Sequence, residues 1–367
     1  MDKNITEFEE LLTEVKAISD HENFETFCNT REFEQMIASK ESRIDFNEKL
    51  HKDIIEFIDK NIANDNKLCY VLFFLLFTLY RRKRIGNMEL FTNTYLYKFK
   101  QYPSSEFIEL LTIYSVKKDN ERLHELLIRS KRLSESKGAT YDFTKHSGIN
   151  NFYVEVVCTY FELNLDERFD EKSSYYIKDA IEKIDKAIMS CNGQVYSKFY
   201  LNKGRLEALK GNYDKGEEYI VKAIQEIGLS VNRSYTVNEY QYYLTKLDMM
   251  RLNDMNNQKM KEVEKVKIDN IKSLSLMTAL LSFILGAINI FSSTTNILAL
   301  GILMVTYLGL ILTLIGVLLF GIKLLYREKD KKYGIYNLVI FIAGLIIFAV
   351  SIILIIKFNL HLTYKEQ

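Results

Sequence analysis

The chain has 367 residues, a formal net charge of +1, one proline and no tryptophan. Its near-zero charge gives no global argument for a nucleic-acid partner, and its length allows a sizeable buried core. Charged residues crowd the first 272 positions and nearly vanish afterwards. We therefore expect a long polar part followed by a short lipid-soluble part.

The polar part has the pattern of consecutive amphipathic helices. Apolar residues recur there at three-and-four spacing, and almost no proline interrupts them. The apolar stretch 68–80 is too short to span a bilayer, so we expect a helix buried between its neighbours. The predicted helices are 5–18, 22–38, 44–63, 67–84, 87–100, 104–117, 120–135, 148–163, 174–190, 197–210, 214–228 and 236–272.

A repeat signature lies between residues 148 and 230. Small residues stand where two helices cross, and larger ones fill the gaps between the helices. The residues are Tyr200, Gly204, Gly211, Tyr213, Gly216, Ile220 and Ala223. Ala180, Ile184 and Ala187 occupy the equivalent positions of the second helix thirty-six residues earlier. This pattern resembles the tetratricopeptide repeat. Lys203 and Glu207 depart from it, because they stand where the repeat prefers a leucine and an aromatic residue. The resemblance implies an α-solenoid whose concave face binds a ligand or partner.

The segment 236–272 lacks glycine and proline, so one helix is expected to run from the solenoid into the membrane; its weakest point is 253–258, NDMNNQ. The predicted fold class is all-α, a cytoplasmic α-solenoid followed by a three-helix transmembrane bundle. Its parts are N-terminal helices at 1–66, the solenoid at 67–235, a connecting helix at 236–272, a transmembrane domain at 273–357 and an extracytoplasmic tail at 358–367.

Three uncharged stretches match the roughly 30 Å hydrocarbon core of a bilayer. The expected spans are about 273–292, 297–322 and 335–357. Basic residues precede the first span and separate the second from the third, at Lys259, Lys261, Lys265, Lys267, Lys272, Lys323, Arg327, Lys329, Lys331 and Lys332. The positive-inside rule then predicts a cytoplasmic N-terminal domain and an outside C-terminus. The Lys-, Ile- and Asn-rich composition favours a low-GC bacterium, so the expected location is a bacterial inner membrane.

Small and weakly polar residues form a stripe on each of the first two spans. The stripes consist of Ser275, Thr278, Ser282, Gly286 and Asn289, and of Thr306, Gly309, Thr313 and Gly316. One interpretation is close helix packing. The other is a pore lined by several subunits, since three spans from one chain are too few to enclose one. Apart from Lys357 at the very end of the third, the spans contain no charged residue, which argues against a proton relay.

A basic, tyrosine-rich set in the solenoid is the candidate ligand site. It comprises Arg81, Arg82, Lys83, Arg84, Tyr97, Lys98, Lys100, Arg129, Lys131 and Arg132. Cations at a helix C-terminus complement the helix dipole, which accounts for the first four without any ligand. Alternatively, the set binds a nucleotide or oligonucleotide signal by charge and stacking, or contacts anionic lipid headgroups.

No phosphate-binding glycine loop, nucleophile elbow or helical zinc motif occurs. Cys28, Cys69, Cys158 and Cys191 lie far apart, and so do the histidines. We therefore expect no enzyme activity, no catalytic residues, no metal and no cofactor.

A helical-repeat receptor joined to a charge-free membrane bundle resembles the architecture of bacterial antiphage membrane effectors, such as the Hailong membrane effector. The resemblance implies a signal-gated, homo-oligomeric effector or ion channel, controlled by a nucleotide signal or a companion defence protein and causing abortive infection. The alternative is a membrane-anchored scaffold that recruits a protein partner.

Overall fold

A computed structural model describes residues 3–44, 46–83, 87–116, 119–167, 170–190, 196–227, 233–293, 297–326 and 331–357. It is 87% helical, and its described part has fifteen α-helices and one two-stranded hairpin, so the chain is all-α. The chain divides into two compact units, Met1–Leu252 and Asn253–Gln367.

Short polar caps start many helices of the first unit. The side chains of Asn47, Asn87 and Asp119 each accept a hydrogen bond from a backbone N–H three residues on, which stabilises a helix N-terminus. The helices are α1 (Lys3–Ser19), α2 (Phe24–Phe27), α3 (Arg31–Glu41), α4 (Glu48–Asn61), α5 (Asn66–Lys83), α6 (Met88–Tyr95), α7 (Ser104–Val116), α8 (Asn120–Glu135), α9 (Ser147–Leu163), α10 (Glu171–Met189), α11 (Ser197–Leu209) and α12 (Tyr213–Gln225). Single-turn 3-10 helices occupy Leu96–Phe99, Phe143–Lys145 and Leu165–Glu167.

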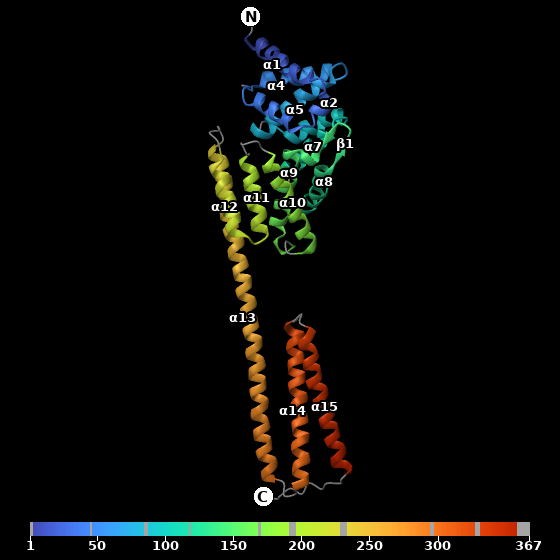
Figure 1. The fold of residues 1–367 in the computed structure, drawn as a ribbon, viewed down its shortest axis with the longest axis vertical. Coiled ribbons are helices and arrows are strands. Elements are labelled where there is room, and N and C mark those ends of the chain that lie inside the picture. Colours follow the sequence, from blue (N-terminus) through green and yellow to red (C-terminus); the bar gives the residue numbers. More distant parts are fainter. Residues whose placement is uncertain are drawn as a thin grey trace. The chain divides into compact units, whose positions relative to one another are not determined.

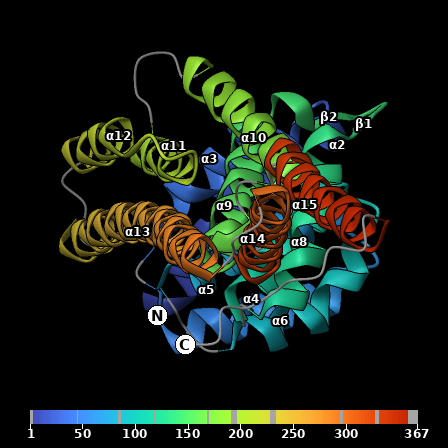
Figure 2. The same ribbon diagram turned by 90° about the horizontal axis from the view of Figure 1, so that it is seen from below.

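From α5 to α12 each helix packs against the next one in the chain (Figure 1). This serial packing is a helical-repeat architecture, as the spacing predicts. The α11 and α12 pair lies side by side in both ribbon views (Figure 2). At their crossing a Cβ on Gly204 would lie 2.7 Å from the carbonyl oxygen of Gly216, so only glycine permits this approach. Gly211, at φ +86°, ends α11 in the left-handed region.

Helix α5 forms the centre of the core. Its residues from Leu68 to Leu76 are all buried, and it packs against α1, α3, α4 and α6. The prediction that 68–80 belongs to the core and not to the membrane is therefore confirmed.

Three local features differ from the sequence prediction. The helix expected at 87–100 is an α-helix only over Met88–Tyr95 and continues as the 3-10 helix Leu96–Phe99. The helix expected at 22–38 is divided into α2 and α3, because the Thr30 hydroxyl accepts a hydrogen bond from the Phe33 N–H and starts a new helix there. A short antiparallel hairpin, β1 (Lys137–Gly138) with β2 (Tyr141–Asp142), follows α8. Each strand of this hairpin has only two residues, which is too short to show an alternating pattern in the sequence.

Helix α13 (Arg233–Ser293) is 61 residues long and helical through 253–258, so the predicted continuity is confirmed. Its first turns belong to the first unit, where Tyr240, Leu247 and Met250 are buried. Its later residues belong to the second unit, which also contains α14 (Ile297–Tyr326) and α15 (Lys331–Lys357). Within the described residues, three helices are long and apolar enough to cross a membrane, over Tyr235–Asn289, Ile297–Val317 and Leu338–Lys357. The predicted tail at 358–367 lies outside the described residues.

Candidate ligand cavity and membrane helices

The predicted basic set divides into groups with different surroundings. Arg81 and Arg82 line a cavity. Lys83 ends α5, but the structure does not describe its side chain, and Arg84 lies outside the described residues. Lys98 pairs with Asp59 of α4 at 3.2 Å, and its ammonium lies 4.9 Å from the Tyr95 ring centroid. Tyr97 and Lys100 are exposed.

The three cations on α8 pair with neighbouring helices. Arg129 binds Glu109 of α7 at 2.9 Å, and Arg132 binds Glu106 of the same helix at 3.0 Å. Lys131 binds Asp179 of α10 at 3.0 Å. Carboxylates thus already bind these cations, and their partners lie on two different helices. The residues of the predicted basic set therefore do not form a single site in this structure.

The cavity beside Arg81 and Arg82 has a volume of about 260 Å³ and lies among α3, α5, α7, α9 and α11. Six aromatic side chains contribute to its wall, Phe74, Phe77, Phe107, Phe152, Tyr196 and Phe199. Four cations and two carboxylates complete the charged part of the lining, Arg31, Arg81, Arg82, Lys198, Glu34 and Glu155. Sequence analysis identified only Arg81 and Arg82, because the other residues come from helices far apart in the chain.

Most cations of this cavity have a carboxylate partner. Arg31 contacts Glu34. Lys198 contacts Glu155 at 2.7 Å. Arg82 contacts Glu41, a buried residue outside the cavity lining, at 3.1 Å.

Arg81 differs from these three cations. Among the described residues, its guanidinium has no carboxylate within ion-pair distance, and its side chain is exposed. The cavity therefore presents a cation with free hydrogen-bond donors beside aromatic surface.

The pKa of Glu155 reflects the positive charge around the cavity. Burial alone would raise the pKa of this carboxyl, yet Lys198, Arg205 and Arg81 together hold the pKa below its ordinary value. Glu155 is thus ionised at neutral pH, and Arg81 contributes to that positive charge without contacting the carboxylate.

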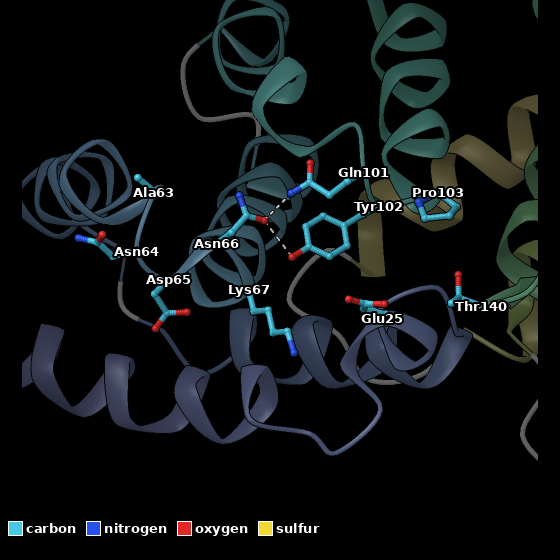
Figure 3. A pocket seen from close by; sticks show the side chains of 10 residues that line it. All are labelled: Glu25, Ala63, Asn64, Asp65, Asn66, Lys67, Gln101, Tyr102, Pro103 and Thr140. Atoms are coloured by element: carbon cyan, nitrogen blue, oxygen red, sulfur yellow. Dashed lines mark hydrogen bonds between the residues drawn. The ribbon is translucent and has the colours of Figure 1, made fainter.

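A second cavity, of about 620 Å³, lies near the start of α5 (Figure 3). Asn66 accepts hydrogen bonds there from Gln101 at 2.5 Å and from the Tyr102 hydroxyl at 2.9 Å. Its charged lining consists of Glu25, Asp65 and Lys67. Carboxylates outnumber cations in it, so it is a poorer anion site than the cavity beside Arg81.

In the second unit, the stripe on α14 lies against α15. A Cβ on Gly309 would lie 2.7 Å from the backbone nitrogen of Phe348, and one on Gly316 would lie 2.7 Å from the Phe341 Cα. Thr313 lies beside Gly344 of α15, and the hydroxyls of Thr306 and Thr313 bond to the carbonyl four residues earlier in their own helix. These positions allow α14 and α15 to approach closely.

The stripe on α13 has a different environment. The Tyr307 hydroxyl of α14 donates to the Ser282 carbonyl oxygen at 2.9 Å, and the Tyr307 ring lies over Gly286. Thr278, Ser282 and Asn289 are exposed and Ser275 is half-buried. The most apolar window of this helix has no buried residue.

Across the described residues, no three His, Cys, Asp or Glu side chains gather to hold a metal. Cys28, Cys69 and Cys158 are free and buried, and burial raises the pKa of each thiol to about 12. Such thiols are poor nucleophiles.

Comparisons with protein-family models, with curated proteins and with solved structures find no match for this chain. The fold defines the chain as a helical-repeat protein, with three candidate membrane-spanning helices among its described residues.

Proposed function

We propose that this chain is a signal-gated, oligomeric membrane effector or ion channel whose helical-repeat unit is a cytoplasmic sensor. In this proposal it acts in bacterial antiphage defence, in the inner membrane, and responds to a phosphorylated small molecule, a nucleotide signal or a companion protein. The observation that carries the proposal is α13, because this one helix contains residues of the repeat core and the first candidate span.

Several features support an action on the membrane. The apolar helices of the second unit suit contact with a lipid bilayer. The polar stripe on α13 remains largely exposed in the single chain, so it is available to other copies. A self-associated ring of such helices encloses a weakly polar path, which a single chain does not.

The experiment measures membrane potential with a voltage-sensitive dye in bacteria that express the chain, before and after phage challenge. Wild type should depolarise the cells, and the purified protein should be an oligomer in detergent. Ser282→Leu places a bulky side chain on the stripe and should abolish the response. Ile284→Leu lies two positions away, on the opposite face of the helix, and should leave the response intact.

The competing function is a membrane-anchored scaffold. A monomer in detergent, together with unchanged membrane potential under both conditions, would overturn the channel proposal and favour the scaffold. Equal responses from Ser282→Leu and Ile284→Leu would remove the α13 stripe from the mechanism.

A further inference from the structure

The lining of the cavity beside Arg81 carries an excess of positive charge. It holds four cations and two carboxylates, a formal charge of +2. A phosphate monoester carries about −1.5 to −2 at pH 7. Glu41, which pairs with Arg82 at 3.1 Å, is buried and does not line the cavity.

Two side chains of the lining, Arg81 and Lys198, supply donors that suit a phosphoryl group. Arg81 has the donors of a planar guanidinium and no carboxylate partner among the described residues, and a guanidinium binds phosphate oxygens in pairs. The Lys198 ammonium uses one bond for Glu155 at 2.7 Å, which leaves hydrogens for a second acceptor. Hydrogen-bond donors that no carboxylate of the described residues uses, on Arg81 of α5 and Lys198 of α11, therefore border the same cavity.

The size and the walls of the cavity limit the rest of the ligand. A volume of about 260 Å³ lies just below the roughly 300–1,000 Å³ typical of ligand pockets and suits a small molecule. The aromatic side chains on α5, α7, α9 and α11 favour a planar or apolar group beside the phosphate.

We infer that this cavity binds a small phosphate monoester, with its phosphoryl group on Arg81 and Lys198 and an apolar group against the phenylalanines. The binding itself stands on the cavity alone, whereas its consequence for the membrane rests on the proposed function. A structural link to α13 exists within the first unit. Ser197, between the cavity residues Tyr196 and Lys198, lies in hydrogen-bond contact with the buried Tyr240 of α13 at 3.1 Å.

The test uses the full chain in detergent and measures phenyl phosphate binding by calorimetry. Wild type should bind phenyl phosphate saturably, inorganic phosphate more weakly and phenol not at all. Arg81→Gln should weaken phenyl phosphate binding by about tenfold or more, since it removes a charged donor. Arg132→Gln is the matched control, because that arginine is 71% exposed and pairs with Glu106 outside the cavity lining; its affinity should equal that of wild type.

A second experiment distinguishes two possible ligands of the cavity, a free metabolite and a lipid headgroup. The distinction is needed because phosphatidic acid also ends in a phosphate monoester. The chain in nanodiscs with phosphatidic acid should bind phenyl phosphate as tightly as in nanodiscs without it. Competition by the lipid would overturn the assignment to a free metabolite.

No saturable binding, or equal affinities of Arg81→Gln and wild type at unchanged melting temperature, would overturn the inference itself. Binding without any depolarisation of cells would leave the inference standing and contradict the proposed function. The two failures are therefore distinguishable.

Discussion

At the scale of single residues, the most consequential group in the first unit is a buried ion cluster. Glu162 of α9 accepts hydrogen bonds from Arg205 of α11 at 2.7 and 2.9 Å and from Lys246 of α13 at 2.7 Å. Glu162 and Arg205 are both almost fully buried. Three helices meet at this carboxylate, and α13 is held to the repeat core through it.

Arg205→Ala should therefore lower the free energy of unfolding of the first unit by about 3–5 kcal/mol, because it leaves a buried carboxylate with an incomplete set of partners. Unfolding in urea is measured through maleimide reaction of the three buried thiols, which react only after they are exposed. Arg251→Ala is the control. It removes an ion pair with Asp214, whose side chain is 99% exposed, and should cost about 0–1 kcal/mol. Similar urea midpoints for the two variants would contradict the role of the cluster.

The same carboxylate makes stability depend on pH. Burial would raise the pKa of Glu162, but Arg205 and Lys246 hold the pKa below its ordinary value. A carboxyl with a lowered pKa stabilises the folded state above its unfolded pKa, about 4.3 for Glu, and that stability is lost as the pH falls through the folded pKa.

The urea midpoint of wild type should therefore fall steeply below about pH 4.3. In Glu162→Gln the midpoint should be lower at pH 7 and should change less with acid. A pH profile of the same slope in both proteins would show that other groups control acid unfolding.

At the scale of elements, much of the fold is readable from the sequence because helix periodicity is a local signal. The buried helix α5, the continuous α13 and the glycine crossing of α11 with α12 all follow from residue spacing. The departure from the repeat pattern at Lys203 shows contacts that residue spacing does not reveal. Lys203 pairs with Asp185 of α10 at 2.6 Å and lies 4.5 Å from the Tyr219 ring centroid, so polar contacts replace the expected leucine.

The candidate site was less predictable because helix periodicity is local and does not show which distant helices pack together. Arg81 and Arg82 stand out in the sequence as part of a charge run, whereas Arg31 and Lys198 are isolated cations on helices more than a hundred residues apart. Only tertiary packing brings them to one cavity. The pairing of Arg129, Lys131 and Arg132 with carboxylates is likewise a property of the packed helices and not of local sequence.

The α14–α15 contact gives a prediction about an element pair. Gly316→Leu should separate these helices, because a side chain there meets the Phe341 backbone. Gly301→Leu on the same helix should be tolerated, since a Cβ at that position meets nothing within 4 Å. The measurement is disulfide cross-linking between cysteines placed at Leu312 and Ala343, in a background without native cysteines. Equal cross-linking in the two variants would contradict close glycine-mediated packing.

At the scale of the whole molecule, the three apolar helices determine how the chain partitions. A helix with about twenty apolar residues inserts into a bilayer and is not released by removing electrostatic attraction. The basic residues before the first span, by contrast, support attachment that salt weakens. High salt therefore releases a protein that is attached by charge, whereas only detergent releases one that is inserted through apolar helices.

The full chain should therefore stay in the membrane pellet after washes with high salt and with alkaline carbonate, and should enter the supernatant only with detergent. The matched variant replaces Leu345 and Ile346 on α15 by lysine. Both residues are exposed in the single chain, so the change lowers the apolar character of one helix without opening the described core. The variant should also stay in the pellet after carbonate, because the spans on α13 and α14 are unchanged, but it should be extracted at a lower detergent concentration than wild type, because each lysine at mid-span costs about 2.5–3.5 kcal/mol. Release of wild type by salt alone would show that the apolar helices pack against protein and do not span the bilayer, and it would remove the physical basis for an effector that acts on the membrane.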